Sequence, residues 1–314
     1  MAHFADRLAE AVEAKGNPCA VGLDPRLESI PAPLRDEVVG DGPLTCESAA
    51  ALLRVFCREV LDIVAPKVPV AKVQAAFFER FGPPGYQAYV DTVAYARSKG
   101  LVVIADVKRA DIGSSAAAYA EAHLGVTTVN GQELFDLGAD ACTVNPYFGL
   151  DGVEPFIHQA VRRDRGVFIL VRTTNPGADR IQGLSCKGVP FFLRIGALVH
   201  DWGSRHVGSS GYSCVGAVVA GTQPIDAEKL RRMMPQAYFL VPGYGAQGAG
   251  PAEVAKTFDA RGRGAIVSSS RGIIFAHAVS PYDRQFGEAR WREAIAAAAD
   301  AMVAQLRAIT GMPQ

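Results

Sequence analysis

The sequence predicts an α/β fold, a (β/α)8 TIM barrel formed by residues 1–314 as a single domain. Short β-branched runs recur along the whole chain and alternate with segments of helical character, as in parallel α/β folds. Polar residues follow the ends of these runs, where such a barrel carries its functional groups. An open parallel sheet with a helical appendage is the alternative. The expected strands are residues 18–23, 68–73, 101–107, 141–145, 167–172, 215–220, 238–241 and 265–268.

Helical segments are expected between and around these strands. The clearest are residues 48–63, 87–98, 116–124 and 252–258. A further helix should precede the first strand, because Phe4, Leu8 and Val12 form one apolar face and Gly16 is suited to end it. Residues 290–309 indicate a closing amphipathic helix. Residues 179–213 indicate an inserted loop and helix after the fifth strand.

The charge balance argues against nucleic-acid and membrane partners. The chain has 32 Lys and Arg residues and 32 Asp and Glu residues, so no basic excess favours phosphate backbones or anionic lipids. The first residues lack the apolar core of a signal peptide, and no apolar run approaches membrane-spanning length. Six cysteines without a Cys-x-x-Cys pair indicate reduced thiols. We therefore expect a cytoplasmic protein that binds a small molecule.

The most informative segment is IADVKRADIG at residues 104–113. Because side chains alternate along a strand, Asp106 and Lys108 should point the same way, with Asp111 in the loop that follows. Two carboxylates beside one ammonium at the end of an apolar strand are costly to desolvate unless the cluster has a use. A solvated ion pair at an exposed edge is the structural alternative.

The first two strands also end in charged residues. In VPVAK, Val68, Val70 and Lys72 share one face, which would direct the Lys72 ammonium into the barrel mouth beside the third strand. Extension of this lysine to solvent is the alternative. Asp24 ends the first strand before a proline. It is either a turn residue or an acceptor for a substrate hydroxyl.

The segment LVPGYGAQGAG at residues 240–250 contains a Gly-x-Gly-x-x-Gly spacing between a strand and a helix. A dinucleotide site of the Rossmann type is therefore an alternative. That site requires an acidic residue after the next strand to hold a ribose. The chain has Ser268, Ser269 and Ser270 there, which disfavours the dinucleotide site.

A phosphate site fits the same segment better. Barrels often bind phosphate with the loops after strands seven and eight, through backbone N–H groups and a helix N-terminus. Gly245, Gln247 and Gly248 belong to the first loop, and Arg271 and Gly272 to the second. Arginine is suited to a bidentate phosphate contact. The histidines show no metal-ligand spacing and no cofactor motif remains, so the sequence predicts neither a metal nor a cofactor.

Seven blocks in order resemble the orotidine 5′-monophosphate decarboxylase family, in its longer bacterial type. They are VGLDP (21–25), AKVQAAFFE (71–79), ADVKRADIGS (105–114), VNPYFG (144–149), RTTNPGA (172–178), PGYGAQG (242–248) and SRG (270–272). The resemblance spans almost the whole chain. It implies a lyase that converts orotidine 5′-monophosphate to UMP and CO2 in de novo pyrimidine biosynthesis, without a cofactor.

The resemblance also implies the catalytic residues. Lys72, Asp106, Lys108 and Asp111 are similar to the family's charged tetrad, with Lys108 as the proton donor to the carbanion. In the family the last aspartate reaches into the site of the partner subunit, so we expect a homodimer that shares Asp111 across its interface.

Substrate contacts follow from the same resemblance. Asp24 would hold a ribose hydroxyl, and Ser115 would contact the ribose across the dimer interface. Thr174 would lie near the pyrimidine, while Gln247 and Arg271 would bind the phosphate.

Two positions depart from the family pattern. Val73 stands where a proline is expected and Ala110 where a glycine is expected, but neither change removes a charged group. One rival is a magnesium-dependent decarboxylase of the same superfamily that acts on a keto-sugar phosphate. Such relatives carry an acidic metal ligand where this chain has Lys72. A second rival is a non-catalytic nucleotide-binding barrel, which would lack a member of the tetrad.

Overall fold

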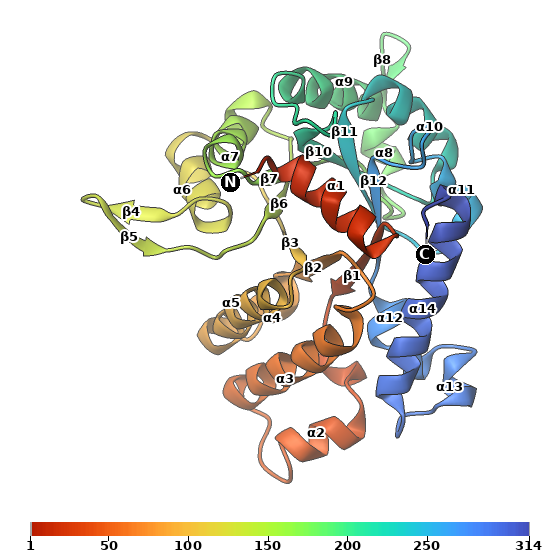
Figure 1. The fold of residues 1–314 in the computed structure, drawn as a ribbon. Helices are drawn as coiled ribbons and strands as arrows, with labels where there is room; N and C mark the ends of the chain where they lie inside the picture. Colours follow the sequence, from red (N-terminus) through yellow and green to blue (C-terminus); the bar gives the residue numbers. More distant parts are fainter. Residues whose placement is uncertain (1, 314) are drawn as a thin grey trace.

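A computed structural model describes residues 2–313 (Figure 1). Eight parallel strands form a closed barrel in the order β1-β12-β11-β10-β7-β6-β3-β2, which confirms the predicted (β/α)8 fold. Each expected strand lies within two residues of an observed one at either end. The barrel strands are β1 (Cys19–Leu23), β2 (Val70–Gln74), β3 (Val102–Arg109), β6 (Ala141–Val144), β7 (Gly166–Arg172), β10 (Ser213–Val219), β11 (Ala237–Val241) and β12 (Ala265–Ser269).

Helices surround this barrel (Figure 1). The expected N-terminal helix is present and ends at Gly16, which has the left-handed φ of 60° that favours glycine. The expected closing helix is also present, as α14. The helices are α1 (Phe4–Lys15), α2 (Ala32–Val38), α3 (Cys46–Val64), α4 (Ala76–Glu79), α5 (Gly82–Ser98), α6 (Gly113–His123), α7 (Leu150–Arg162), α8 (Asp179–Gln182), α9 (Phe191–Gly203), α10 (Pro224–Met233), α11 (Pro251–Ala255), α12 (Arg271–Ile274), α13 (Tyr282–Gln285) and α14 (Trp291–Thr310).

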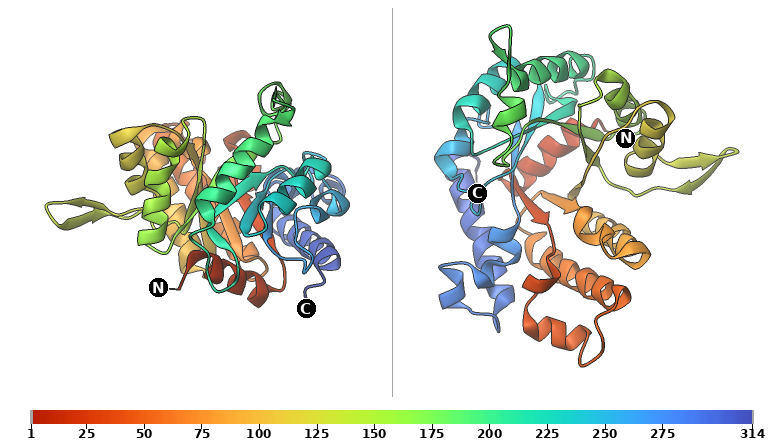
Figure 2. Two further views of the ribbon diagram at one scale, coloured as in Figure 1. Left: turned by 90° about the horizontal axis from the view of Figure 1, so that it is seen from above. Right: turned by 180° about the vertical axis from the view of Figure 1, so that it is seen from behind.

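The strands are almost completely buried because helices cover the barrel outside and side chains fill it inside. One continuous apolar cluster extends from Phe4 to Met312. Phe4 of α1 packs edge-on against Phe168 of β7, with ring centroids 6.2 Å apart. Helix α1 (red in Figure 2, left) thereby closes the N-terminal end of the barrel, opposite the end at which the green segment after β7 projects.

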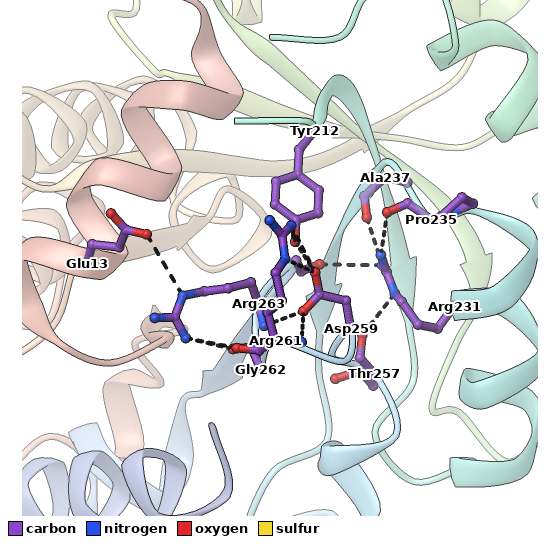
Figure 3. Close-up of polar contacts among 11 residues, drawn as sticks. Glu13, Tyr212, Arg231, Pro235, Ala237, Thr257, Asp259, Arg261, Gly262 and Arg263 are labelled. Atoms are coloured by element: carbon purple, nitrogen blue, oxygen red, sulfur yellow. Dashed lines mark hydrogen bonds and ion pairs between the residues drawn. The ribbon is translucent and has the colours of Figure 1, made fainter. Parts of the chain in front are cut away.

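A buried arginine ties together the backbone at this closed end (Figure 3). The Arg231 guanidinium donates to the carbonyl oxygens of Thr257, Pro235 and Ala237 at 3.1, 3.3 and 2.7 Å. It also lies 3.6 Å from the centre of the Phe239 ring. Burial lowers the pKa of Arg231 to about 10. The charge is thus satisfied by carbonyl dipoles and an aromatic face.

The structure differs from the sequence prediction after β3. A hairpin of β4 (Thr127–Val129) and β5 (Gln132–Phe135) follows α6 and projects away from the barrel (Figure 1). The prediction missed it. Asn130 and Gly131 form its turn with φ of 50° and 80°, and Asn-Gly is a strong hairpin signal.

The expected insertion at residues 179–213 is also smaller than predicted. Helix α8 and the short hairpin of β8 (Ser185–Cys186) and β9 (Val189–Pro190) are additional to the barrel. Helix α9, however, packs against β7 and β10. It is therefore the barrel's own helix, and the prediction that assigned it to an insertion was wrong.

Among residues 2–313, no helix has the length and apolar character needed to cross a membrane. All six cysteines are free thiols, four of them buried.

Candidate active site

A cleft of about 530 Å³ opens at the C-terminal ends of the barrel strands. Strands β2, β3, β6, β7, β10, β11 and β12 and the loops after β1, β7, β11 and β12 contribute to it, so residues distant in sequence meet there. The predicted residues that line the cleft are Asp24, Lys72, Asp106, Lys108, Thr174, Gln247 and Arg271. A smaller hollow of about 250 Å³ lies at the other end of the barrel, beside α1, Tyr212 and Arg263.

A chain of ion pairs crosses the floor of the cleft. The Lys72 Nζ atom lies 3.0 Å from Asp106 Oδ2 and 3.2 Å from Asp24 Oδ1. The Lys108 Nζ atom lies 2.5 Å from Asp106 Oδ1. The register explains the first contact, since β2 and β3 pair with Gln74 opposite Asp106. The prediction that Asp106 and Lys108 project to the same side is confirmed.

Burial makes these charges strongly dependent on one another. The Asp106 and Lys72 side chains are 6% and 8% exposed, whereas that of Lys108 is 43% exposed and faces the open cleft. Burial alone would raise the pKa of Asp106, but the charges of Lys72 and Lys108 lower it overall. Burial alone would lower the pKa of Lys72, but Asp106 and Asp24 raise it overall. Asp106 and Lys72 therefore both stay ionised at neutral pH.

Two polar residues that the sequence analysis did not identify complete the environment of Asp106. Gln74 Nε2 donates to Asp106 Oδ2 at 2.9 Å, and the Thr143 hydroxyl donates to Asp106 Oδ1 at 2.8 Å. Gln74 could have been found from its spacing, because it follows Lys72 by two residues on the same strand face. Thr143 could not be identified from the sequence, because a β-branched residue is common within any strand.

The lining of the cleft includes apolar side chains and a hydrogen-bonded loop. The Thr173 N–H donates to Gln182 Oε1 at 3.0 Å, and Gln182 Nε2 donates back to the Thr173 hydroxyl at 2.7 Å. This exchange fixes the loop that carries Thr174. Such a slot can hold a flat ring against apolar groups and present hydroxyls to its polar edge. The apolar residues of the lining include Phe77, Leu170, Val218, Leu240 and Pro242.

The glycine loop after β11 is a compact turn. Gly243, Gly245 and Gly248 have φ of 103°, 73° and 96°, which side chains rarely adopt. The Gly245 N–H, expected to contact phosphate, instead donates to the Ala249 carbonyl at 2.9 Å. Gly245 thus shapes the loop, while Gln247 lines the cleft.

Arg271, at the start of α12, lines the cleft from the neighbouring loop. Its side chain is exposed. Gly272 follows Arg271 in α12 and lies outside the lining of the cleft.

Asp111 and Ser115 lie outside the cleft of their own chain. Asp111 Oδ1 accepts the N–H of Ile112 at 2.8 Å, and Ser115 is exposed in the first turn of α6. Ile112 is itself 55% exposed although it is apolar. The structure therefore brings together three members of the predicted tetrad and leaves the fourth on the surface.

Within residues 2–313, no group of three or more His, Cys, Asp or Glu side chains is arranged to hold a metal ion. The carboxylates of the cleft instead accept hydrogen bonds from lysines.

Fold and site together define a barrel enzyme that places buried charges beside a ring-sized slot. The Orotidine 5′-phosphate decarboxylase / HUMPS family model matches residues 43–280. The chain belongs to this family. The orotidine 5′-phosphate decarboxylase of Rhodopirellula baltica is 43% identical over 98% of this chain and 100% of the relative. That of Caldicellulosiruptor bescii is 38% identical over 88% of this chain and 91% of the relative.

A solved structure agrees with these sequence relatives. The OMP decarboxylase of Leishmania donovani superposes with a TM-score of 0.74 at 26% identity, covering 99% of this chain and 100% of that one. The family expected from the sequence, and its class as a carboxy-lyase, are confirmed.

Proposed function

We propose that the protein decarboxylates orotidine 5′-monophosphate to UMP and CO2, as a step of de novo pyrimidine biosynthesis. The observation that carries this proposal is the placement of the half-exposed Lys108 ammonium beside two buried charges, Asp106 and Lys72, at one end of a ring-sized slot.

The chemistry requires a cation at one ring carbon. When the bond between C6 of the pyrimidine and the carboxylate carbon breaks, CO2 leaves and the electron pair stays on C6. That pair lies in the ring plane, so the ring π-system does not delocalise it. A preorganised ammonium stabilises the developing charge. Lys108 then transfers a proton from Nζ to C6, giving UMP and a neutral amine that solvent reprotonates.

Asp106 and Lys72 prepare Lys108 for this step. Asp106 holds the Lys108 ammonium in position through a 2.5 Å contact. Lys72 balances the buried charge of Asp106 and links it to Asp24. Asp24 lies at the edge of the same network, where its second carboxylate oxygen would accept a ribose hydroxyl.

The phosphate would bind at the opposite end of the cleft. Gln247 and Arg271 line that end, and Gly272 supplies backbone beside Arg271. Contacts to a non-reacting phosphate provide binding energy that orients the ring against Lys108. Thr174 would contact the polar edge of the pyrimidine.

The position of Asp111 and Ser115 outside the cleft of their own chain supports a homodimer. Neither side chain lines the cleft of its own chain, although the family resemblance implies that both belong to an active site. We propose that each subunit supplies Asp111 to complete the tetrad of its partner and Ser115 to contact the partner's ribose. Sedimentation equilibrium tests the dimer. Mixing inactive Lys108→Ala and Asp111→Ala variants should restore part of the activity, because a mixed dimer contains one complete site. The cytoplasmic location expected from the sequence remains a prediction.

The direct test follows the loss of orotidine 5′-monophosphate absorbance with the purified protein. Turnover that survives EDTA supports the proposal and argues against the rival that uses magnesium and a keto-sugar phosphate. Lys72 also argues against the magnesium-dependent decarboxylase, because that enzyme needs an acidic metal ligand at this position. Absence of turnover with orotidine 5′-monophosphate would refute the proposal.

A further inference from the structure

The hydrogen-bond ladder between β3 and β6 is interrupted at the site. Ala105 pairs with Cys142, but the next pair joins Arg109 to Val144. Three residues of β3, numbers 106–108, therefore lie opposite the single residue Thr143 of β6. This is an enlarged β-bulge, a feature that re-aims side chains next to functional sites.

In the bulge, the Thr143 hydroxyl takes the place of backbone acceptors of β6. Its Oγ1 accepts the N–H of Val107 and the N–H of Lys108, each at 3.0 Å. The regular pairing resumes when the Asn145 N–H donates to the Arg109 carbonyl at 3.0 Å. Thr143 is 1% exposed, so water does not compete for these contacts.

The bulge places Lys108 in an unusual backbone conformation. Its φ is 44°, in the left-handed region that residues with a side chain rarely occupy. Such a conformation persists only where the surrounding structure imposes it. The hydrogen bond from the Lys108 N–H to Thr143 Oγ1 of the neighbouring strand β6 holds the Lys108 backbone in this conformation.

The direction of every hydrogen bond in this cluster is determined. A threonine hydroxyl has one proton and two acceptor lone pairs. Backbone amides only donate, so both lone pairs of Thr143 are occupied and its proton must point to Asp106 Oδ1, 2.8 Å away. Asp106 Oδ1 also accepts Lys108 Nζ, while Oδ2 accepts Lys72 Nζ and Gln74 Nε2. Asp106 thus receives four donors and has no place for a proton of its own.

We infer that Thr143 is a positioning residue for the decarboxylation, which holds the Lys108 backbone in its left-handed conformation and keeps Asp106 as an acceptor. This inference rests on the proposed function. One hydroxyl connects the backbone of the proton donor to the carboxylate that aligns its ammonium. Thr143 itself transfers no proton to substrate.

The test compares Thr143→Val with Thr143→Ser. Valine has nearly the shape of threonine but no hydroxyl, so it leaves two buried N–H groups without an acceptor and removes one donor from Asp106. We expect kcat to fall about 100-fold, as for an angstrom-scale misplacement of a catalytic group. The Kd for UMP should stay within about threefold, because the contacts to phosphate and ribose are untouched. Serine keeps the hydroxyl and should restore most of kcat.

Thr92→Val is the matched control. Thr92 is fully buried outside the cleft, and its hydroxyl donates to the Ala88 carbonyl of its own helix at 2.7 Å and contacts the Cys57 thiol. We expect normal kcat in this variant. If Thr143→Val does not fold, Thr143→Ala gives the same comparison with a smaller side chain.

A crystal structure of the valine or alanine variant supplies a readout that is independent of activity. We expect Lys108 to leave the left-handed region. Normal kcat without the hydroxyl, equal losses for the serine and valine variants, or an unchanged Lys108 backbone would each overturn the inference. A wild-type protein without decarboxylase activity would instead refute the proposed function, and the Lys108 backbone would still test the structural part of the inference.

Discussion

The Lys72 ammonium lies 3.0 Å from the Asp106 carboxylate, and both side chains are less than one-tenth exposed. Opposite charges so deeply buried stabilise the protein only as a pair. Removing one partner leaves the other charge without compensation, at a cost of about 3–5 kcal/mol.

Lys72→Met should therefore lower the free energy of unfolding by about 3–5 kcal/mol. Urea denaturation followed by circular dichroism measures this difference. Lys67→Met is the control, because Lys67 pairs with Asp300, which is 60% exposed. That exposed pair should contribute less than about 1 kcal/mol. Equal effects of the two substitutions would contradict the view that burial makes the Lys72 pair special.

Arg271→Ala should distinguish phosphate binding from binding of the nucleoside. The side chain lines the cleft and is proposed to bind the phosphate, and charge-assisted hydrogen bonds contribute about 1.5–3 kcal/mol each. Calorimetric titration should show about 10–100-fold weaker UMP binding and nearly unchanged uridine binding. Similar losses for both ligands would place the phosphate elsewhere.

Arg231→Met tests the closed end of the barrel. The buried guanidinium satisfies backbone carbonyls of Thr257, Pro235 and Ala237, which would lose their donors. The free energy of unfolding should fall by about 2–4 kcal/mol, since each unsatisfied group costs about 1–3 kcal/mol before relaxation. Arg232→Met is the adjacent control. Its side chain is 76% exposed and pairs with Glu228, so its loss should change stability by no more than about 0.5 kcal/mol.

The attachment of α1 should depend on pH. Burial alone would raise the pKa of Asp6, but hydrogen bonds from Ser210 and Ser209 lower it to about 2. An unfolded Asp has a pKa of about 3.9. Because the pKa is lower in the folded protein than in the unfolded chain, ionised Asp6 stabilises the folded state at pH values above about 3.9. This stabilisation is lost as the pH falls toward 2.

Asp6→Asn measures this effect. The stability difference between wild type and variant should be constant above about pH 5 and should shrink between about pH 4 and pH 2. A difference that does not change with pH would show that the ionisation of Asp6 does not stabilise the contact.

The fold was predictable because parallel barrel strands are buried on both faces and read as continuous apolar runs. Lys72 and Asp106 were predictable because period-two alternation at strand ends sends charged side chains into the barrel mouth. Alternation also predicted Lys108 on the side of Asp106, but in the structure a β-bulge and a left-handed φ of 44° bring its ammonium there. Thr143 was not predictable. Its importance arises from a bulge in another strand and from the φ of Lys108, and neither leaves a mark on residues 141–144.

Other differences also have local causes. The β4–β5 hairpin carried its Asn-Gly signal, but its strands are too short and too exposed to show a periodic pattern. Gly245 was expected to contact phosphate because barrels often bind phosphate through backbone N–H groups of the loop after the seventh strand. The sequence cannot indicate that Ala249 folds back to accept this N–H.

The most direct test of the central claim is the kcat of Lys108→Ala with orotidine 5′-monophosphate, measured together with UMP binding. If Lys108 stabilises the carbanion and protonates it, turnover should fall below detection while UMP still binds and the wild type remains active in EDTA. Turnover near the wild-type rate in the Lys108→Ala variant would contradict the account.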